Sequence, residues 1–400
     1  MFEMEKLAIF GGAPVREKPI YYGRQCIEQD DIDAVVNTLR SDLITSGPQV
    51  AALEQMLCEL TGAKYAVVVA NGTAALHLAA LAAGFGEGDE VIVSSITFAA
   101  SSNCVLYCGA KPVFADIDMG TYNIDPDCVE KLITPRTKGV VAVDFTGQAV
   151  DHDAIRRLCR ENGLVFIEDA AHAIGTKYNG RPVGCLADMT CFSFHPVKTV
   201  TGGEGGAITT NDEQLYRRMM RLRTHGITRN PEEMVHPSDA LWYNEQVELG
   251  FNYRMTDFQA ALLRSQLNKL DKFSARRKEI VKWYDAVFSQ MPELFVQREI
   301  PESDTTRHLY VIRLNPERLT CDRRQFFDAL YAENVCPQVH YLPVYWHSYY
   351  EKLGYKKGLC PNAEAYYQWS MSIPLYYSLT DEEVEDTVRA VKKVVEYYRK

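Results

Sequence analysis

The sequence lacks the features that mark membrane-spanning and secreted proteins. No apolar run reaches the roughly 18 residues that a membrane span needs. The first residues, MFEMEKLAIFGG, have neither the basic start nor the apolar centre of a signal peptide. The cysteines number eleven, an odd count, and include no CxxC pair, so neither a disulfide framework nor a zinc site is indicated. We therefore expect a cytoplasmic protein that uses no metal and binds no membrane.

Positive charge is also in short supply. Lys and Arg together number 43 against 53 Asp and Glu, so the formal net charge is −10 at pH 7. A general nucleic-acid binder needs a basic face, and we do not expect one here. An anionic small ligand is still compatible with this charge, because local positive charge or a helix N-terminus suffices to bind it. A length of 400 residues exceeds one ordinary core and predicts two domains.

The glycine-rich stretch around Lys198 lacks the third glycine of a dinucleotide-binding fingerprint. After Gly203 and Gly205, the third position is occupied by Ile208. What is present is a single lysine in a loop between two β-rich runs. A lysine in a glycine-rich hairpin is ordinarily a protonated surface residue. Held among small residues beside an aldehyde, its amine can instead form a Schiff base and later move protons.

Strand-like and helix-like stretches alternate through the first half of the chain. The strand-like runs are 65–70, 90–94, 112–116, 140–144 and 164–168. This rhythm predicts an α/β fold with a mostly parallel sheet flanked by helices, in which ligands collect beyond the carboxyl ends of the strands. Residues 1–255, with an irregular N-terminal arm, are predicted to form this large domain. Residues 256–400 are predicted to form a linking helix and a small C-terminal α/β domain with strands at 308–314 and 336–341.

Three small residues, Gly72, Thr73 and Ala74, stand where a predicted strand turns into a helix. Free backbone N–H groups and the helix dipole at such a turn suit a phosphate. The alternative is that Thr73 simply caps the helix. Ser193, at the end of the β-rich run before Lys198, could add a hydroxyl to the same phosphate.

A second candidate segment follows the strand that ends near Glu168. Asp169 is placed at the strand end, where its carboxylate either faces a ligand or caps a loop, and strand alternation directs Glu168 to the opposite face. Three residues further on, His172 either hydrogen-bonds near the same ligand or only packs. Phe98, in SSITFAAS, either covers a flat ligand ring or is an ordinary core aromatic. Asn252 lies in GFNYRMTD, where Thr256 or Asp257 is expected to cap the next helix.

These segments in this order resemble the DegT/DnrJ/EryC1/StrS family of nucleotide-sugar aminotransferases. The motifs that carry the resemblance are NGTAAL, EDAAHA, SFHPVK with GEGG, and GFNYRMTD, and the likeness covers nearly the whole chain. The resemblance implies a type I PLP-dependent transferase fold, similar to aspartate aminotransferase. It also implies pyridoxal 5′-phosphate (PLP) as cofactor and a homodimer with shared active sites.

The resemblance further implies a role for each candidate residue. Lys198 corresponds to the Schiff-base lysine and proton shuttle, and Asp169 to the partner of the protonated ring nitrogen of PLP. With PLP as the ligand, the open interpretations become concrete: His172 either hydrogen-bonds near the ring oxygen or only packs, and Phe98 either lies over the ring or is a core aromatic. The implied phosphate contacts are Gly72, Thr73, Ala74, Ser193 and, from the neighbouring subunit, Asn252.

A narrower likeness suggests the substrate. The segments YGRQC, DFTG, LRTHGITR and QVHYLP resemble a branch of the family that acts in pseudaminic acid synthesis. The likeness implies transfer of an amino group from glutamate, which becomes 2-oxoglutarate, to C4 of a UDP-linked 4-keto-6-deoxy-N-acetylhexosamine. The product would be UDP-4-amino-4,6-dideoxy-N-acetyl-β-L-altrosamine. The implied substrate-side residues are Tyr22, Thr45 and Tyr341, with Arg229 added because a guanidinium suits a pyrophosphate.

Three other functions stay open from the sequence. The first is an aminotransferase for another keto-sugar nucleotide or a cyclitol, which would share every motif above. The second is a PLP-dependent sugar dehydratase, which Lys198 disfavours, because family members with that activity carry His at this position. The third is a non-catalytic PLP-binding regulator, for which the sequence offers no DNA-binding appendage.

Overall fold

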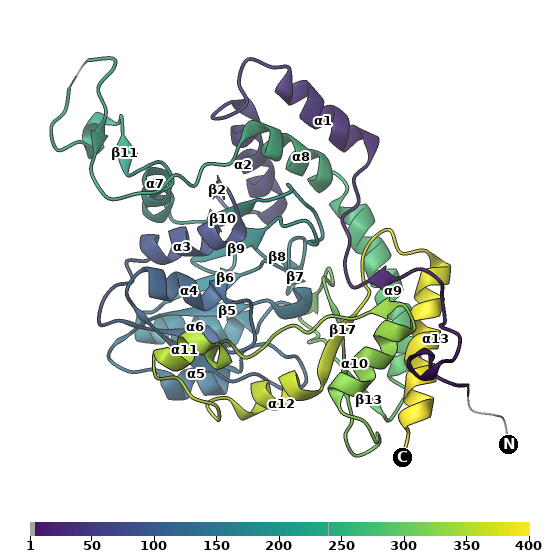
Figure 1. Ribbon diagram of the computed structural model, residues 1–400. Coiled ribbons are helices and arrows are strands. Elements are labelled where there is room, and N and C mark those ends of the chain that lie inside the picture. The colour runs from purple at the N-terminus through teal and green to yellow at the C-terminus, as the bar shows by residue number, and fades with distance from the viewer. Residues whose placement is uncertain (1–4, 239) are drawn as a thin grey trace.

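A seven-stranded sheet forms the centre of the protein (Figure 1). The structure, a computed structural model, describes residues 5–238 and 240–400. The strand order is β2-β10-β9-β6-β5-β3-β4, and β10 runs antiparallel to both of its neighbours while the other pairs are parallel. The strands are β2 Tyr65–Val69, β3 Glu90–Ser94, β4 Lys111–Ala115, β5 Thr137–Val143, β6 Val165–Asp169, β9 Met189–Ser193 and β10 Gly206–Thr210. The predicted mostly parallel sheet is thereby confirmed.

Helices cover both faces of this sheet, so its strands are apolar on both sides. In β2, Val67 and Val69 pack toward α3, α4 and α7, whereas Ala66 and Val68 pack toward α2 and α8. Helices α5 and α6 extend the second layer below β5 and β6. These helices are α2 Pro48–Thr61, α3 Gly72–Ala82, α4 Ala100–Tyr107, α5 Pro126–Leu132, α6 His152–Asn162, α7 Glu213–Leu222 and α8 Asp257–Leu267. The same alternation sends Glu168 and Asp169 to opposite faces, as predicted.

A smaller antiparallel sheet and three helices share a second core near the C-terminus (Figure 1). The elements are β13 Leu294–Val296, β15 Tyr310–Leu314, β17 Ser370–Ile373, α9 Leu270–Phe288, α10 Arg323–Ala332 and α13 Asp381–Tyr398. The strand predicted at 308–314 is present as β15. The strand predicted at 336–341 is wrong: β16 covers Val335–Cys336 and pairs with β1, Ile20–Tyr21. Pro337 follows and has no N–H with which to continue the ladder.

The helix predicted to join the two parts is in fact two helices, α8 and α9. Helix α8 packs on α2 and lies beside α1, Gln29–Leu39, among the N-terminal helices (Figure 1). The division at 255/256 stays a prediction. Of the predicted N-terminal arm, residues 1–4 lie outside the described part of the chain.

The segment between α7 and α8 projects from the body as an arm, which we define as residues 224–238 and 240–250 (Figure 1). Two short strands, β11 Ile227–Thr228 and β12 Glu245–Gln246, pair along it, and a 3₁₀ turn covers Pro231–Glu233. Within residues 5–238 and 240–400, no helix is both long enough and apolar enough to cross a lipid bilayer. The remaining short elements are η1 Ala8–Phe10, η2 Phe145–Gly147, η4 Val344–Trp346, β7 Lys177–Tyr178, β8 Arg181–Pro182, β14 Ser303–Asp304, α11 Ser348–Lys352 and α12 Pro361–Trp369.

Candidate active site

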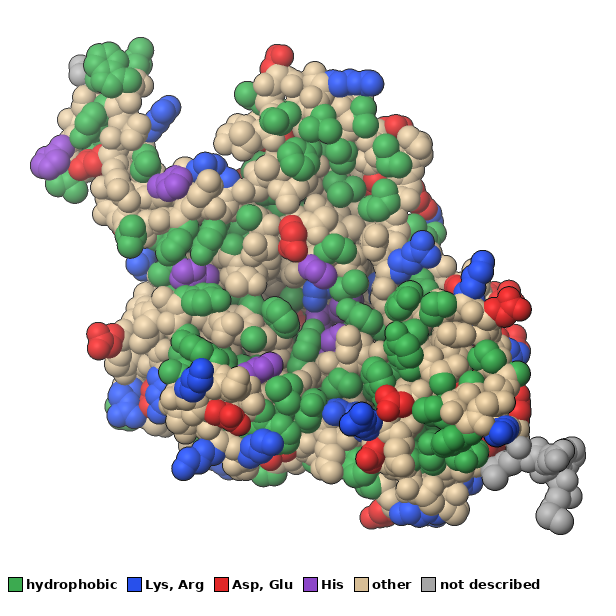
Figure 2. All heavy atoms as spheres, in the orientation of Figure 1, with side chains coloured by type: hydrophobic (Ala, Val, Ile, Leu, Met, Phe, Trp, Pro, Cys, Tyr) green, Lys and Arg blue, Asp and Glu red, His purple; other side chains and the backbone are tan. Residues whose placement is uncertain are grey.

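A cavity of about 680 Å³ opens beyond the carboxyl ends of β2, β6 and β9. Figure 2 shows the surface hollowed near the centre of the face drawn, with histidine side chains exposed there. Most of the residues predicted from the sequence line this cavity. They are Tyr22, Gly72, Thr73, Ala74, Phe98, Asp169, His172, Ser193, Lys198 and Tyr341. The prediction that the residues after these strands share one cleft is confirmed.

Lys198 reaches the cavity from the turn that follows β9. Its backbone N–H donates to the carbonyl of His195 at 2.9 Å, and Gly202 N–H donates to the carbonyl of Phe194 at 3.0 Å, so the loop doubles back on the strand end. Burial of the amine lowers the pKa of Lys198 to about 8, although the negative charge of Asp169 acts in the opposite direction. A larger share of the amine is therefore neutral near pH 7–8 than in an ordinary lysine, as a nucleophile requires.

Asp169 ends β6 with its carboxylate held by two donors. Ser101 Oγ donates to Oδ2 at 2.6 Å, and Ala171 N–H donates to Oδ1 at 3.1 Å. Burial raises the pKa of Asp169, while the hydrogen bonds from Ser101 and Ala171 and the charge of Lys198 oppose that rise. Sequence reasoning did not single out Ser101. Its signal in the sequence was a run of small polar residues just after a predicted strand, which many α/β turns share.

The turn between β2 and α3 is held against the neighbouring strands. Asn71 is the N-cap of α3 and accepts a hydrogen bond from Ala74 N–H at 2.8 Å, so the alternative that Thr73 caps this helix is wrong. A Cβ on Gly72 would lie 2.8 Å from Ser193 Cβ. A Cβ on Gly206 would lie 2.3 Å from the carbonyl oxygen of Asn71. Gly72, Thr73 and Ala74 line the cavity at this turn, and the N-terminus of a helix suits a phosphate.

Three buried histidines lie at the cavity: His172 and His340 line it, and His308 packs against His172. His172 Nδ1 accepts a hydrogen bond from Thr146 N–H at 3.3 Å, which leaves the ring proton on Nε2, 3.5 Å from the hydroxyl of Tyr341. The rings of His172 and His308 are 4.5 Å apart. Burial, together with the positive charge of Lys198, lowers the pKa of His340 to about 3 and those of His172 and His308 well below the usual range. All three side chains are consequently neutral, and among the described residues that line the cavity Lys198 is the one Lys or Arg.

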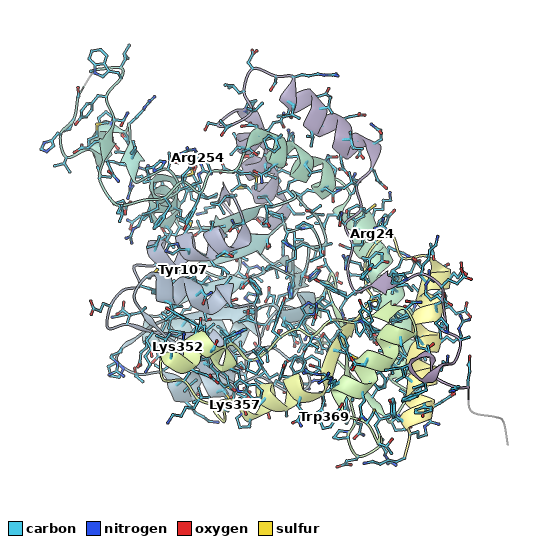
Figure 3. All side chains as sticks on the ribbon, viewed as in Figure 1. Arg24, Tyr107, Arg254, Lys352, Lys357 and Trp369 are labelled. Atoms are coloured by element: carbon cyan, nitrogen blue, oxygen red, sulfur yellow. The ribbon has the colours of Figure 1, made fainter. Side chains whose placement is uncertain are left out.

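Three predicted residues lie away from the cavity of their own chain. Thr45 is exposed and forms a β-bridge with Thr256, and Asn252 is exposed and forms one with Thr224. Arg229 is exposed on the arm, just after β11. Figure 3 shows Arg254, two residues after Asn252, near the base of this arm. The predicted cap at the start of α8 is confirmed, because Thr256 forms a capping box with Gln259.

A second polar cluster lies on the opposite face of the sheet. His152 Nε2 and Glu168 Oε1 are 2.6 Å apart, Thr190 Oγ1 donates to Glu168 Oε2 at 2.7 Å, and Asp144 lies beside them. Burial and the charge of Glu168 raise the pKa of Asp144 well above its usual value. Among the described residues this group has the spacing of metal ligands, but its members already bond one another and are almost inaccessible to solvent. We interpret it as a structural network.

The chain belongs to the DegT/DnrJ/EryC1/StrS aminotransferase family, whose model matches residues 25–392. It is 41% identical to the spore coat polysaccharide biosynthesis protein SpsC of Bacillus subtilis, over 94% of this chain and 96% of that protein. It is 37% identical to a UDP-4-amino-4,6-dideoxy-N-acetyl-beta-L-altrosamine transaminase of Campylobacter jejuni, over 94% of this chain and 98% of that protein. The PLP form of a putative sugar aminotransferase, Spr1654 from Streptococcus pneumoniae, superposes with a TM-score of 0.88 at 31% identity, covering 95% of this chain and 99% of that one.

Family membership confirms the fold class, the enzyme class and the cofactor expected from the sequence. The chain is a transaminase of the type I PLP-dependent fold. The cavity fits this cofactor: a lysine amine with a lowered pKa, a buried carboxylate with lone pairs to spare and a helix N-terminus all face one space. The roles of the individual residues stay predictions.

Proposed function

We propose that the protein transfers an amino group from glutamate to C4 of a UDP-linked 4-keto-6-deoxy-N-acetylhexosamine. The product is UDP-4-amino-4,6-dideoxy-N-acetyl-β-L-altrosamine, an intermediate of pseudaminic acid synthesis. The observation that carries the reaction class is the convergence of Lys198, Asp169 and the N-terminus of α3 on one cavity. The substrate is supported by the transaminase of Campylobacter jejuni, which aligns over nearly its full length.

When bound, PLP supplies an electron sink that stabilises negative charge at the carbon losing a proton. Lys198 would hold the cofactor at its aldehyde through Nζ and would act as a free amine once the donor's amine has taken its place. The freed amine then takes the proton from Cα of glutamate, and in the second half-reaction it delivers a proton to C4 of the sugar. A lysine pKa of about 8 serves both directions, because the amine exchanges a proton readily near neutral pH.

Other residues hold the cofactor and exclude water. Asp169 would stabilise the proton on the ring nitrogen, and Phe98, which lines the cavity and is 62% exposed, would cover the ring. The N–H groups of Gly72 and Thr73, with the hydroxyl of Ser193, would bind the phosphate. Ala74, whose N–H donates to Asn71 Oδ1, would line the same turn beside it. On the substrate side, Tyr22 and Tyr341 line the cavity and orient the sugar.

A homodimer completes each site in this proposal. The arm carries strongly exposed apolar side chains, including Leu241 at 95%, Trp242 at 81% and Leu249 at 81% (Figure 2). Apolar surface of this kind marks an interaction site. We place it against a second copy of the chain, so that Asn252 and Arg229 enter the partner's cavity. Thr45 then faces the same substrate from the edge of that interface.

We place the protein in a reducing cytoplasm, because the cysteines of the chain are free. One of them, Cys191, is on β9, the strand before Lys198.

Of the relatives described above, the one that is 41% identical is named as a protein of spore-coat polysaccharide synthesis. That identity favours, as a second candidate, amination of a different keto-sugar nucleotide at the same site. The two candidates share the cofactor and the glutamate half-reaction and differ only in the sugar accepted.

The experiment that tests the proposal follows the visible absorbance of the PLP-loaded protein. Glutamate is added first, and a panel of UDP-linked 4-keto-6-deoxy-N-acetylhexosamines is added next, with products weighed by mass spectrometry. We expect glutamate to remove the absorbance of the lysine-bound cofactor. The 4-keto sugar that corresponds to the proposed altrosamine product should then restore it. Lys198→Ala should abolish the starting absorbance, whereas Lys131→Ala, an exposed lysine on α5, should leave it unchanged.

Each outcome of this titration has a distinct meaning. Recovery with a different keto sugar would retain the aminotransferase and replace its substrate. A starting absorbance that survives Lys198→Ala would refute the assignment of the site. Loss of water from the sugar in place of gain of an amine would establish a dehydratase.

A further inference from the structure

A chain of three buried side chains, Thr97, Ser101 and Asp169, ends at the carboxylate of Asp169. Thr97 Oγ1 and Ser101 Oγ are 2.6 Å apart, and Ser101 Oγ is 2.6 Å from Asp169 Oδ2. Thr97 is 2% exposed and Ser101 is fully buried. Thr97 lies just before α4, and Ser101 is in its first turn. Helix α4 thus supplies the side-chain donor to the residue that, in the proposed function, pairs with the cofactor's ring nitrogen.

The direction of these hydrogen bonds follows from the number of protons. The hydroxyl of Ser101 has one proton and two acceptors within reach, Asp169 Oδ2 at 2.6 Å and the carbonyl of Phe98 at 3.3 Å. A charged acceptor at the shorter distance is favoured over a neutral one at the longer distance. With its proton directed to Asp169, Ser101 Oγ can only accept from Thr97. The chain therefore runs in one direction, from Thr97 to Ser101 to Asp169.

This arrangement leaves Asp169 ready for one further donor. Oδ2 accepts from Ser101 and Oδ1 from Ala171 N–H, and an ionised carboxylate has lone pairs left over. Asp169 lines the cavity, so those lone pairs are available to a proton on a ligand there. Burial alone would favour the protonated acid, which would compete with the ring nitrogen for the proton.

We propose that Ser101 is a positioning residue that holds the Asp169 carboxylate ionised and in a single orientation toward the ring nitrogen of PLP. This inference rests on the proposed function, because it takes Asp169 as the partner of that nitrogen. Thr97 supports the same carboxylate indirectly, because its hydrogen bond fixes the orientation of the Ser101 hydroxyl. Among these residues Thr97 and Asp169 line the cavity and Ser101 does not.

The neighbouring serine offers a matched control. Ser102 is also fully buried on α4, but its hydroxyl contacts Tyr350 Oη at 2.5 Å and the carbonyl of Ala99, and makes no hydrogen bond to Asp169. Ser102→Ala removes the same atom from the same helix as Ser101→Ala. Any effect that reports only the loss of a buried hydroxyl should therefore appear in both variants.

The experiment measures binding of two cofactors to cofactor-free protein. One is PLP, and the other is 1-deaza-PLP, in which carbon replaces the ring nitrogen, so that no pairing with Asp169 forms. We expect Ser101→Ala to weaken PLP binding on the order of tenfold, the scale of one hydrogen bond to a charged group, and to leave 1-deaza-PLP binding unchanged. Ser102→Ala should change neither affinity. Thr97→Val should weaken PLP binding in the same cofactor-specific way but by a smaller factor.

If Ser101→Ala weakens the binding of PLP and of 1-deaza-PLP equally, the inference is overturned and Ser101 has only a packing role. Unchanged affinity for PLP would overturn it as well. If Ser101→Ala does not fold, Thr97→Val alone decides, because an effect common to both cofactors again contradicts the proposal. Failure of the unaltered protein to bind PLP at all would instead refute the proposed function, so the two failures are distinguishable.

Discussion

Asp257 caps helix α2 from 210 positions further along the chain. Its Oδ2 accepts a hydrogen bond from Gly47 N–H at 2.7 Å, and its Oδ1 accepts one from Gln49 N–H at 2.8 Å. The carboxylate is fully buried and is the first residue of α8. Thr45 forms a β-bridge with Thr256 immediately beside it. The start of α8 therefore fixes both the first turn of α2 and the segment that carries a predicted substrate residue.

Replacing Asp257 with Ala should lower the free energy of unfolding by roughly 2–4 kcal/mol, because two backbone donors at the start of α2 lose their charged and buried acceptor. Urea unfolding measures the change, and Asp271→Ala, an exposed acid in the first turn of α9, is the control. The control should stay within about 0.5 kcal/mol of the unaltered protein. Similar losses in the two variants would show that the cap contributes little.

Gly72→Ala should weaken PLP binding and destabilise the protein, because the new Cβ would lie 2.8 Å from Ser193 Cβ and 3.0 Å from its Oγ. Adding Ser193→Gly removes the atoms that clash, so the double variant should recover part of the stability lost by Gly72→Ala. Thermal unfolding of the cofactor-free proteins measures that recovery. Simple additivity of the two changes would contradict the predicted contact.

The reaction of PLP with cofactor-free protein should accelerate with pH, with its midpoint near pH 8 and a plateau above it. Only the neutral amine attacks an aldehyde, and burial lowers the pKa of Lys198 to about 8 from the usual 10.5. Stopped-flow absorbance across pH 6–10 gives the midpoint. A midpoint close to the usual lysine pKa of 10.5 would contradict the prediction, because it would show that the Lys198 amine is exposed to water and that the loop around it is open.

Acid should destabilise the protein partly through His340, whose pKa is lowered to about 3 by burial and the charge of Lys198. Below the unfolded value of 6.5, the unfolded chain takes up a proton that the folded chain does not. Stability is therefore lost as pH falls from about 6.5 toward 3, by at most ~1.4 kcal/mol per pH unit for this group. As pH falls through this range, the free energy of unfolding of His340→Gln should rise relative to that of the unaltered protein, by at most the same ~1.4 kcal/mol per pH unit. Parallel stability curves would show that His340 titrates normally.

Mixing two inactive variants should restore activity if the sites are shared between subunits. Lys198→Ala removes the nucleophile, and Asn252→Ala removes the predicted phosphate contact from the partner. A mixed dimer then contains one site with both residues intact, so refolded 1:1 mixtures should recover about a quarter of the unaltered activity for random pairing of symmetric dimers. Persistent inactivity of a mixture that forms mixed dimers would place Asn252 in its own chain's site or outside any site.

Residues that sit directly after strands were predictable, because sheet geometry brings the carboxyl ends of parallel strands to one edge. Gly72, Asp169 and Lys198 therefore met in one cavity as expected. Ser101 was not predictable, because its contact with Asp169 depends on the rotation of α4 against the sheet and on packing, not on sequence spacing. The strand predicted after Cys336 failed for a local reason, the missing N–H of Pro337.

The sequence by itself determined the alternating α/β architecture, the lysine loop and the family, because periodicity and short motifs are local properties of the chain. Tertiary structure alone decided which groups carry charge at the site. The lowered pKa of Lys198, the neutral His172 and the Ser101 hydrogen bond to Asp169 all arise from burial and from partners far away in sequence. Desolvation is a property of the assembled core, and no spacing within a single segment encodes it.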